Sequence, residues 1–141
     1  MDRKDFLQLF VLGTAAAATG CLGACSKDES TGPTTGAANV DFTVDLAAAA
    51  SASLVAGTGY VYSSDNAVIV AKTSAGSYVA VQAPCTHEGV RVTFNSSRQQ
   101  FFCAQHSAYF SPTGAVVSGP PPRALKQYTV TQTGNSLRIT G

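Results

Sequence analysis

Cys85-Thr86-His87 and Cys103-Ala104-Gln105-His106 are the two short stretches from which the fold and chemistry of this 141-residue chain can be inferred. They contain both histidines of the sequence and both of its cysteines outside the N-terminal segment, and fifteen residues separate them. Each stretch pairs a thiol with an imidazole at a spacing that lets one loop present both side chains to the same centre. Together they offer two sulfur and two nitrogen ligands to a metal.

Three kinds of site fit these four side chains. In a [2Fe–2S] centre of mixed ligation, two cysteines hold one iron and two histidines hold the other. A structural zinc site can also use two Cys and two His, but it usually pairs like with like, as Cys-x-x-Cys followed by His-x-x-x-His. A disulfide between Cys85 and Cys103 suits an exported protein but leaves both histidines unexplained. The order Cys-His, then Cys-His favours the iron–sulfur centre, with the other two as alternatives.

The two stretches resemble the signature of the Rieske iron–sulfur family, in which Cys-x-His is followed at a distance by Cys-x-x-His. The resemblance implies a [2Fe–2S] cluster with one iron on Cys85 and Cys103 and the other on His87 and His106. It also implies an all-β fold, namely a Rieske-type antiparallel β-sandwich with a small cluster-binding subdomain of two loops. The resemblance covers roughly Tyr60–Thr140, which is most of the chain after its N-terminal segment.

Five further positions correspond to residues that surround the cluster in this family; three match the family and two differ from its quinol-oxidising members. Gly89 stands at the family's glycine position, where the lack of a side chain lets backbone N–H groups approach sulfide. Gly119 and Pro120 begin a proline run that resembles the loop covering the cluster from a third side, with an ordinary rigid connector as the alternative. Ala108 and Phe110 stand where quinol-oxidising members carry a serine and a tyrosine whose hydroxyls donate to sulfur.

A second difference from the quinol-oxidising members concerns their extra pair of cysteines, which form a disulfide that braces the two loops. Val90 and Gln105 occupy those positions here, so this brace is missing. In both respects the chain resembles the Rieske ferredoxins that supply electrons to ring-hydroxylating oxygenases. Fewer donors near sulfur stabilise the reduced cluster less, so we expect a potential toward the bottom of the Rieske range of ~−150 to ~+300 mV.

Short apolar alternations broken by turn residues predict an all-β sandwich or barrel. The expected strands are residues 40–46, 59–63, 67–73, 78–83, 90–94, 99–103, 109–110, 115–117, 125–132 and 136–140. The alanine-rich residues 47–53 could form a helical turn, but we expect them to lead into the next strand. No helix of useful length is expected. The first ligand pair then follows one strand and the second ends a hairpin strand, so two loop tips can converge.

The N-terminal residues are typical of an export signal. Arg3-Lys4-Asp5-Phe6-Leu7 resembles the twin-arginine motif, although Lys4 replaces the second arginine. Leu22-Gly23-Ala24-Cys25 resembles the bacterial lipoprotein box, so we expect Cys25 to be lipidated; an uncleaved anchoring helix is the alternative. The expected organisation is a signal peptide over residues 1–24, a lipidated flexible linker over 25–39 and a Rieske domain over 40–141.

Composition narrows the function further. The formal net charge is +1 and only 12% of residues are charged, which argues against nucleic-acid binding. Both histidines are committed as ligands and no Ser/His/Asp constellation is present, so we expect no small-molecule substrate. We predict ferredoxin-like one-electron transfer between an unidentified redox protein donor and acceptor, not catalysis by the chain alone.

The expected location is the bacterial cell envelope, where the lipid would anchor the chain to a membrane. Ser26-Lys27-Asp28-Glu29 resembles a tag that directs some bacterial lipoproteins to the outer surface, and a charged tether is the alternative. Two other functions stay open. One is the iron–sulfur subunit of a quinol-oxidising or other respiratory complex. The other is a surface binding module stabilised by zinc or a disulfide, without a redox role.

Overall fold

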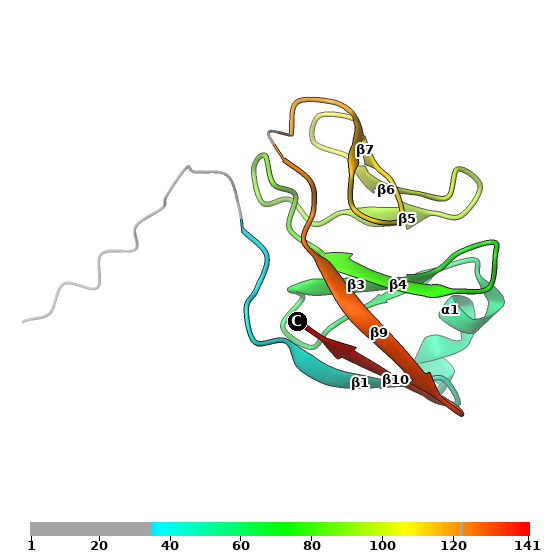
Figure 1. Ribbon diagram of the computed structural model, residues 1–141. Helices are drawn as coiled ribbons and strands as arrows, with labels where there is room; N and C mark the ends of the chain where they lie inside the picture. Colours follow the sequence, from blue (N-terminus) through cyan, green and yellow to red (C-terminus); the bar gives the residue numbers. More distant parts are fainter. Residues whose placement is uncertain (1–34, 122) are drawn as a thin grey trace, which may run out of the picture.

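The computed structural model describes residues 35–121 and 123–141, which fold into two antiparallel sheets. The larger sheet has the strand order β1-β10-β9-β4-β3-β2, and the smaller sheet, which lies above it in Figure 1, has the order β5-β6-β7-β8. The strands are β1 (Asp41–Asp45), β2 (Tyr60–Tyr62), β3 (Val68–Lys72), β4 (Tyr78–Gln82), β5 (Thr93–Asn95), β6 (Gln100–Cys103), β7 (Ala108–Phe110), β8 (Val116–Ser118), β9 (Gln127–Thr133) and β10 (Ser136–Thr140). The predicted antiparallel all-β architecture is confirmed.

β3 and β4 are neighbouring inner strands of the larger sheet and contribute to two hydrophobic cores. Successive side chains of a strand point to opposite faces. In β3, Ile69 therefore joins the core between the two sheets, whereas Val70 joins a second core with residues of β10. In β4, Val81 joins the core between the two sheets and Ala80 joins the second core. Burial on both faces explains why these strands are apolar at nearly every position.

A short helical segment between β1 and β2 contradicts the expectation that residues 47–53 lead directly into a strand. The chain forms a 3₁₀ turn, η1 (Ala49–Ser51), and then the helix α1 (Ala52–Ala56). Alanine is the strongest helix former, and the segment buries Leu54 completely in the second core. Gly57 ends the helix in a left-handed conformation with φ of 73°, and its N–H donates to the Leu54 carbonyl. Burial of Leu54 therefore stabilises this segment as a helix and not as a strand.

Each of the ten predicted strands has an observed counterpart, but two begin two or three residues later than expected. β5 begins at Thr93 because Val90 is used in a turn, where its carbonyl accepts a hydrogen bond from the Cys85 N–H. β9 begins at Gln127 because the Leu125 N–H donates to the carbonyl of Gly114 in another loop. Both differences lie next to the loops that carry the predicted ligands.

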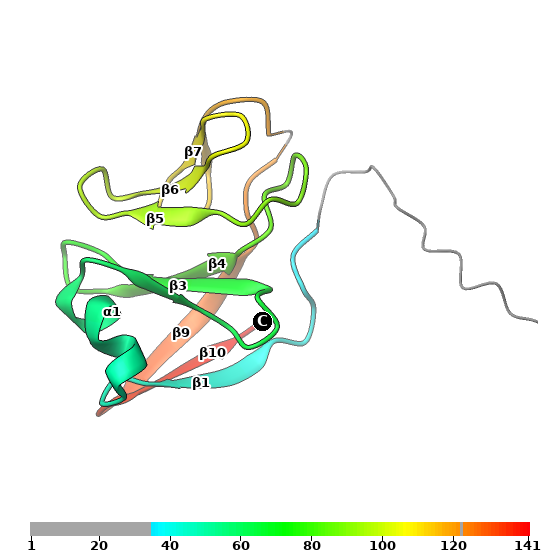
Figure 2. The ribbon, with the colours of Figure 1, turned by 180° about the vertical axis from the view of Figure 1, so that it is seen from behind.

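The described residues that precede β1 are held against the larger sheet. Val40 exchanges two backbone hydrogen bonds with Gly141, and the carbonyl of Ala37 accepts hydrogen bonds from Lys126 Nζ and Tyr128 OH. Residues 35–40 run from β1 toward the end of the molecule that carries the loop after β4, as both views show (Figures 1 and 2). The predicted signal peptide, most of the predicted linker and Cys25 lie outside the described residues.

Within residues 35–121 and 123–141, no helix has both the length and the hydropathy that a membrane crossing requires.

Candidate metal centre

Two loops at one end of the molecule bring the four predicted ligands together. The first loop follows β4 and carries Cys85 and His87, and a bridge between Pro84 and Arg91 closes it at its base. The second loop joins β6 to β7 and carries His106, with Cys103 as the last residue of β6. Both loops lie on the same side of the smaller sheet in Figure 1.

The two histidine rings face each other through the same ring atom. Nδ1 of His87 lies 3.1 Å from Nδ1 of His106, and the ring planes are inclined by 79°. Two nitrogen ligands of one tetrahedral metal, each bound at ~2.0–2.1 Å, stand about 3.3–3.4 Å apart. The separation of the Nδ1 pair is therefore close to that of two ligands of a single metal ion.

The two thiols form a buried pair on the other side of the site. Cys85 and Cys103 are 1% and 2% exposed, and both are free cysteines. Burial raises the pKa of Cys85, and the neighbouring Cys103 thiol raises it further. Backbone N–H groups of His87 and Glu88 act in the opposite direction, because they donate to the Cys85 sulfur and favour its thiolate. The sulfur that would bind a metal is thus already supplied with amide donors.

The sulfur pair and the nitrogen pair do not converge on one point. Among the described residues, His87, Glu88 and His106 form a group whose ligand atoms all lie within 4.8 Å of one another. This group includes neither cysteine. All four ligands of a single zinc ion would lie closer together than this. Separate sulfur and nitrogen pairs fit a cluster that carries one metal ion on each pair.

Gly89 is required by the turn of the first loop. Its φ is 73°, a left-handed conformation that favours glycine, and its N–H donates to the carbonyl of Cys85. The expectation that the missing side chain of Gly89 lets backbone N–H groups approach sulfide stays a prediction. The amides directed at the Cys85 sulfur belong to His87 and Glu88, and the Gly89 amide closes the turn that presents them.

The proline run forms a third segment beside the two ligand loops. Gly119 has a φ of 105°, and a Cβ atom on it would lie 2.7 Å from both Cα and Cβ of Ala108. This glycine therefore allows the segment to lie directly on β7. Pro120 is exposed and Pro121 is buried. The segment thus covers part of β7, the strand that follows the loop carrying His106.

Ala108 and Phe110 point into the core that also contains the two cysteines, and they are 1% and 0% exposed. Neither carries a hydroxyl. Ser107 is exposed with φ of 52°, and the half-buried Tyr109 packs on the opposite face of the smaller sheet, with its ring centroid 4.9 Å from that of Phe102. The Tyr109 ring therefore faces away from the cysteines, as the alternation along β7 predicts.

Thr86 is a site residue that the sequence analysis missed. It lies between two predicted ligands, is fully buried, and its Oγ1 donates a hydrogen bond of 2.7 Å to the carbonyl of Arg123. Arg123 follows the proline run, so this bond ties the first ligand loop to the third segment. A polar residue between two ligands is the only local signal, because its partner is 37 positions away.

Glu88 was also missed, because its partner likewise lies in another loop. Its Oε2 lies 3.9 Å from Nε2 of His106, which belongs to the other loop. Both side chains are partly exposed, at 50% for Glu88 and 36% for His106. The sequence shows that Glu88 follows a ligand, but only the meeting of the two loops places its carboxylate beside a histidine.

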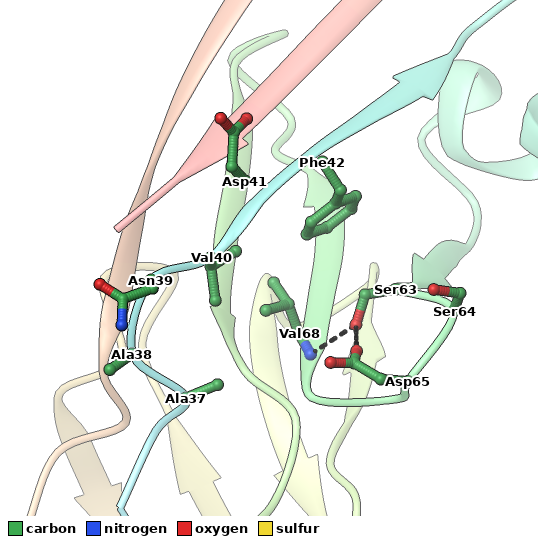
Figure 3. A pocket seen from close by; sticks show the side chains of 10 residues that line it. All are labelled: Ala37, Ala38, Asn39, Val40, Asp41, Phe42, Ser63, Ser64, Asp65 and Val68. Atoms are coloured by element: carbon green, nitrogen blue, oxygen red, sulfur yellow. Dashed lines mark hydrogen bonds between the residues drawn. The ribbon is translucent and has the colours of Figure 1, made fainter.

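A pocket of about 230 Å³ lies elsewhere on the molecule, between residues 37–42 and the turn after β2 (Figure 3). Two of its polar side chains, Ser63 and Asp65, are engaged within that turn. Ser63 Oγ accepts hydrogen bonds from the N–H groups of Ala67 and Val68 and donates to Asp65. The pocket contains neither histidine and contributes nothing to the paired thiols and imidazoles.

Known relatives carry the same kind of domain. The cytochrome b6-f complex iron-sulfur subunit of Chlorobaculum thiosulfatiphilum is 38% identical over 78 residues, which make up 55% of this chain and 42% of that subunit. The corresponding subunit of Chlorobaculum tepidum is 34% identical over 86 residues, or 61% of this chain and 48% of that subunit. The chain thus matches less than half the length of these curated relatives.

Two solved structures have a similar fold. The plasma membrane Rieske protein of the cyanobacterium Synechocystis PCC 6803 superposes with a TM-score of 0.55 at 30% identity, over 64% of this chain and 93% of that one. The ferredoxin of carbazole 1,9a-dioxygenase from Nocardioides aromaticivorans IC177 gives a TM-score of 0.51 over 60% of this chain and 85% of its own, but its 21% identity supports the fold alone.

The model of one protein family matches residues 45–129, which is more than half of the chain. This match includes both ligand loops and the segment that lies on β7. The chain belongs to the Rieske [2Fe-2S] domain family, whose cofactor is the [2Fe–2S] cluster predicted from the sequence.

Proposed function

We propose that the protein transfers single electrons through a [2Fe–2S] cluster held by Cys85, His87, Cys103 and His106. The observation that supports this most strongly is the 3.1 Å approach of the two histidine Nδ1 atoms beside a separate buried pair of thiols. When bound, a cluster of this type accepts and releases one electron at a time. The protein would exchange electrons with other redox proteins and would not act on a small molecule by itself.

Each part of the protein has a distinct task in this proposal. The buried cysteines and their amide donors hold the inner side of the cluster away from water. The histidines lie at the outer side, and the 36% exposure of His106 leaves room for a partner to approach that side closely. Thr86 and Gly119 keep the loops and the covering segment together, which limits the rearrangement that accompanies electron transfer.

The choice of partner depends on details that distinguish two classes of Rieske protein. A ferredoxin-like carrier is supported by Val90 and Gln105, which replace the bracing cysteines, and by Ala108 and Phe110, which replace the two hydroxyl donors. A role in a quinol-oxidising complex is the second candidate, because the relatives described above are cytochrome b6-f subunits. We favour the carrier because the missing hydroxyls concern the cluster surroundings directly.

The proposal also includes export and anchoring. The twin-arginine-like segment and the lipoprotein box would direct the folded protein to the cell envelope, with a lipid on Cys25 attaching it to a membrane. Mass spectrometry of the membrane fraction tests this part separately. Diacylglycerol on Cys25 as the first residue would support it, and an intact N-terminus beginning at Met1 would overturn it.

Metal analysis of protein produced with ample iron tests the central part of the proposal. We expect iron and acid-labile sulfide in equal amounts, about two of each per chain. Stoichiometric zinc without labile sulfide would overturn it. A midpoint potential in the upper half of the Rieske range would keep the cluster but favour the quinol-oxidising complex over the carrier.

A further inference from the structure

The two histidines use their Nδ1 atoms toward each other, so their Nε2 atoms form the outer edge of the site. In proteins that bind metals through histidine, the ring nitrogen that does not bind the metal usually donates its hydrogen to a carboxylate, a carbonyl or water. The acceptor at this position fixes the orientation of the ring and changes the electron density at the metal. The group beside each Nε2 atom is therefore part of the metal centre.

Among the described residues, one side-chain carboxylate lies at this edge. Glu88 Oε2 lies 3.9 Å from Nε2 of His106, which is within ion-pair distance but longer than a direct hydrogen bond. Among the residues that the structure describes, no carboxylate lies within the same distance of a His87 nitrogen. The other described carboxylates belong to Asp41 and Asp45 on β1 and Asp65 in the turn before β3. Glu88 is thus the single negative side chain of the described ligand loops.

We propose that Glu88 is a positioning residue of the metal centre, which orients His106 through its outer nitrogen and lowers the reduction potential of the cluster by its charge. The inference rests on the proposed function, because it assumes that His106 is a ligand. It also makes the two histidines inequivalent, since the Glu88 carboxylate lies within ion-pair distance of a nitrogen of His106, whereas it approaches a His87 nitrogen only to within 4.8 Å.

The sign of the effect on the potential follows from electrostatics. Adding an electron to the cluster adds negative charge close to the Glu88 carboxylate, and like charges repel. The carboxylate therefore favours the oxidised state and lowers the potential. Because both side chains are partly exposed, salt screens this repulsion, and the effect decreases as ionic strength rises.

The test compares variants of the full, cluster-containing protein by film voltammetry at pH 7. Glu88→Gln keeps the shape and an oxygen acceptor for His106 but removes the charge, and Glu88→Lys reverses the charge. Asp45→Asn is the matched control, because it removes the same charge from the far end of β1, where its remaining oxygen can still accept the hydrogen bond from the Ala47 N–H. Iron content and the EPR spectrum establish that each variant is loaded.

We expect Glu88→Gln to shift the reduction equilibrium roughly three- to tenfold in favour of the reduced state, where tenfold corresponds to about 59 mV for one electron. Glu88→Lys should shift it further, and Asp45→Asn should leave it unchanged. Both shifts should shrink between low and high salt.

An unchanged or lowered potential in the loaded Glu88→Gln and Glu88→Lys proteins would overturn the inference. So would a shift that high salt does not reduce, because a packing effect would not be screened. Failure of the proposed function would give a different result, namely a wild-type protein with no reversible one-electron wave and no labile sulfide.

Discussion

The larger sheet and the ligand loops are stabilised in different ways. The larger sheet relies on continuous strand ladders and on β3 and β4, which are buried on both faces. The ligand loops rely on a few specific contacts, such as the Thr86 hydrogen bond and the close approach of Gly119 to β7, and their histidines are partly exposed. The framework can therefore form from hydrophobic burial alone, whereas the site depends on single atoms and on metal binding.

Removal of the cluster should have the largest effect, and it should be confined to one region. We expect Cys103→Ser to abolish cluster binding because it replaces one of the two thiolates. Amides of the first loop, including the Gly89 N–H that donates to Cys85, should exchange with solvent faster. Amides of β3 and β4 should stay protected. Hydrogen exchange followed by mass spectrometry measures both, and equal loss of protection in the two regions would contradict the comparison.

Gly119→Ala tests the contact between the covering segment and β7. The added Cβ would lie 2.7 Å from two atoms of Ala108 in a left-handed backbone conformation, so we expect a loss of roughly 3 kcal/mol in the free energy of unfolding. Gly76→Ala in the β3–β4 turn is the matched control, because φ is also positive there but nothing lies within 4 Å. Gly76→Ala should lower the free energy of unfolding by about 1–2 kcal/mol.

Denaturant unfolding of these two variants gives the difference directly. Equal losses would show that Gly119 is needed only for its backbone conformation and that the covering segment does not depend on close contact with Ala108.

Thr86→Val should have a smaller effect, concentrated in the loops. Valine keeps the shape of threonine but cannot donate to the Arg123 carbonyl, so we expect about 1–2 kcal/mol of destabilisation and faster release of iron to a chelator. Thr86→Ser keeps the hydroxyl and should retain most of the wild-type behaviour. Iron release from Thr86→Val at the wild-type rate would show that the hydrogen bond does not hold the loops.

Tyr62→Phe should have the smallest effect. The Tyr62 hydroxyl donates to the Val92 carbonyl, which links the larger sheet to the start of the smaller one, so we expect a loss of about 1 kcal/mol at neutral pH. Burial raises the pKa of Tyr62 from 10.0 to about 12. A raised pKa means that the neutral form is favoured in the folded state, so the stabilisation is present below pH 10 and is lost as the pH rises toward 12.

Unfolding of wild type and Tyr62→Phe across this pH range measures the difference. Tyr78→Phe is the control, because among the described residues the Tyr78 hydroxyl makes no hydrogen bond. If wild type and Tyr62→Phe keep the same difference in stability from neutral pH to pH 12, the hydroxyl does not contribute as described.

The strands could be predicted from the sequence because each depends on a local pattern. Apolar alternation and turn residues located all ten of them, and the spacing of cysteine and histidine indicated two converging loops. The helical segment was missed because its helical conformation depends on burial of Leu54 against strands that are distant in the sequence. The late starts of β5 and β9 depend on hydrogen bonds between loops, which no local pattern reveals.

The sequence predicts four ligands, which the fold places on two neighbouring loops, but it does not predict the residues that support them. Thr86 and Glu88 act on partners from other loops, so their roles become visible only when the loops are placed together. The resemblance indicated the position of Gly89 but not that its own amide closes the turn of the first loop. Residue type can be inferred from a motif, whereas long-range contacts require the fold.

The EPR spectrum of the dithionite-reduced protein tests the central claim most directly. Mixed ligation by two thiolates and two imidazoles gives a pattern distinct from that of a [2Fe–2S] cluster held by four cysteines. We predict the mixed-ligand spectrum for wild type, and its loss in His87→Ala and His106→Ala. A spectrum typical of four-cysteine ligation, or no spectrum in protein that contains stoichiometric zinc, would contradict the account.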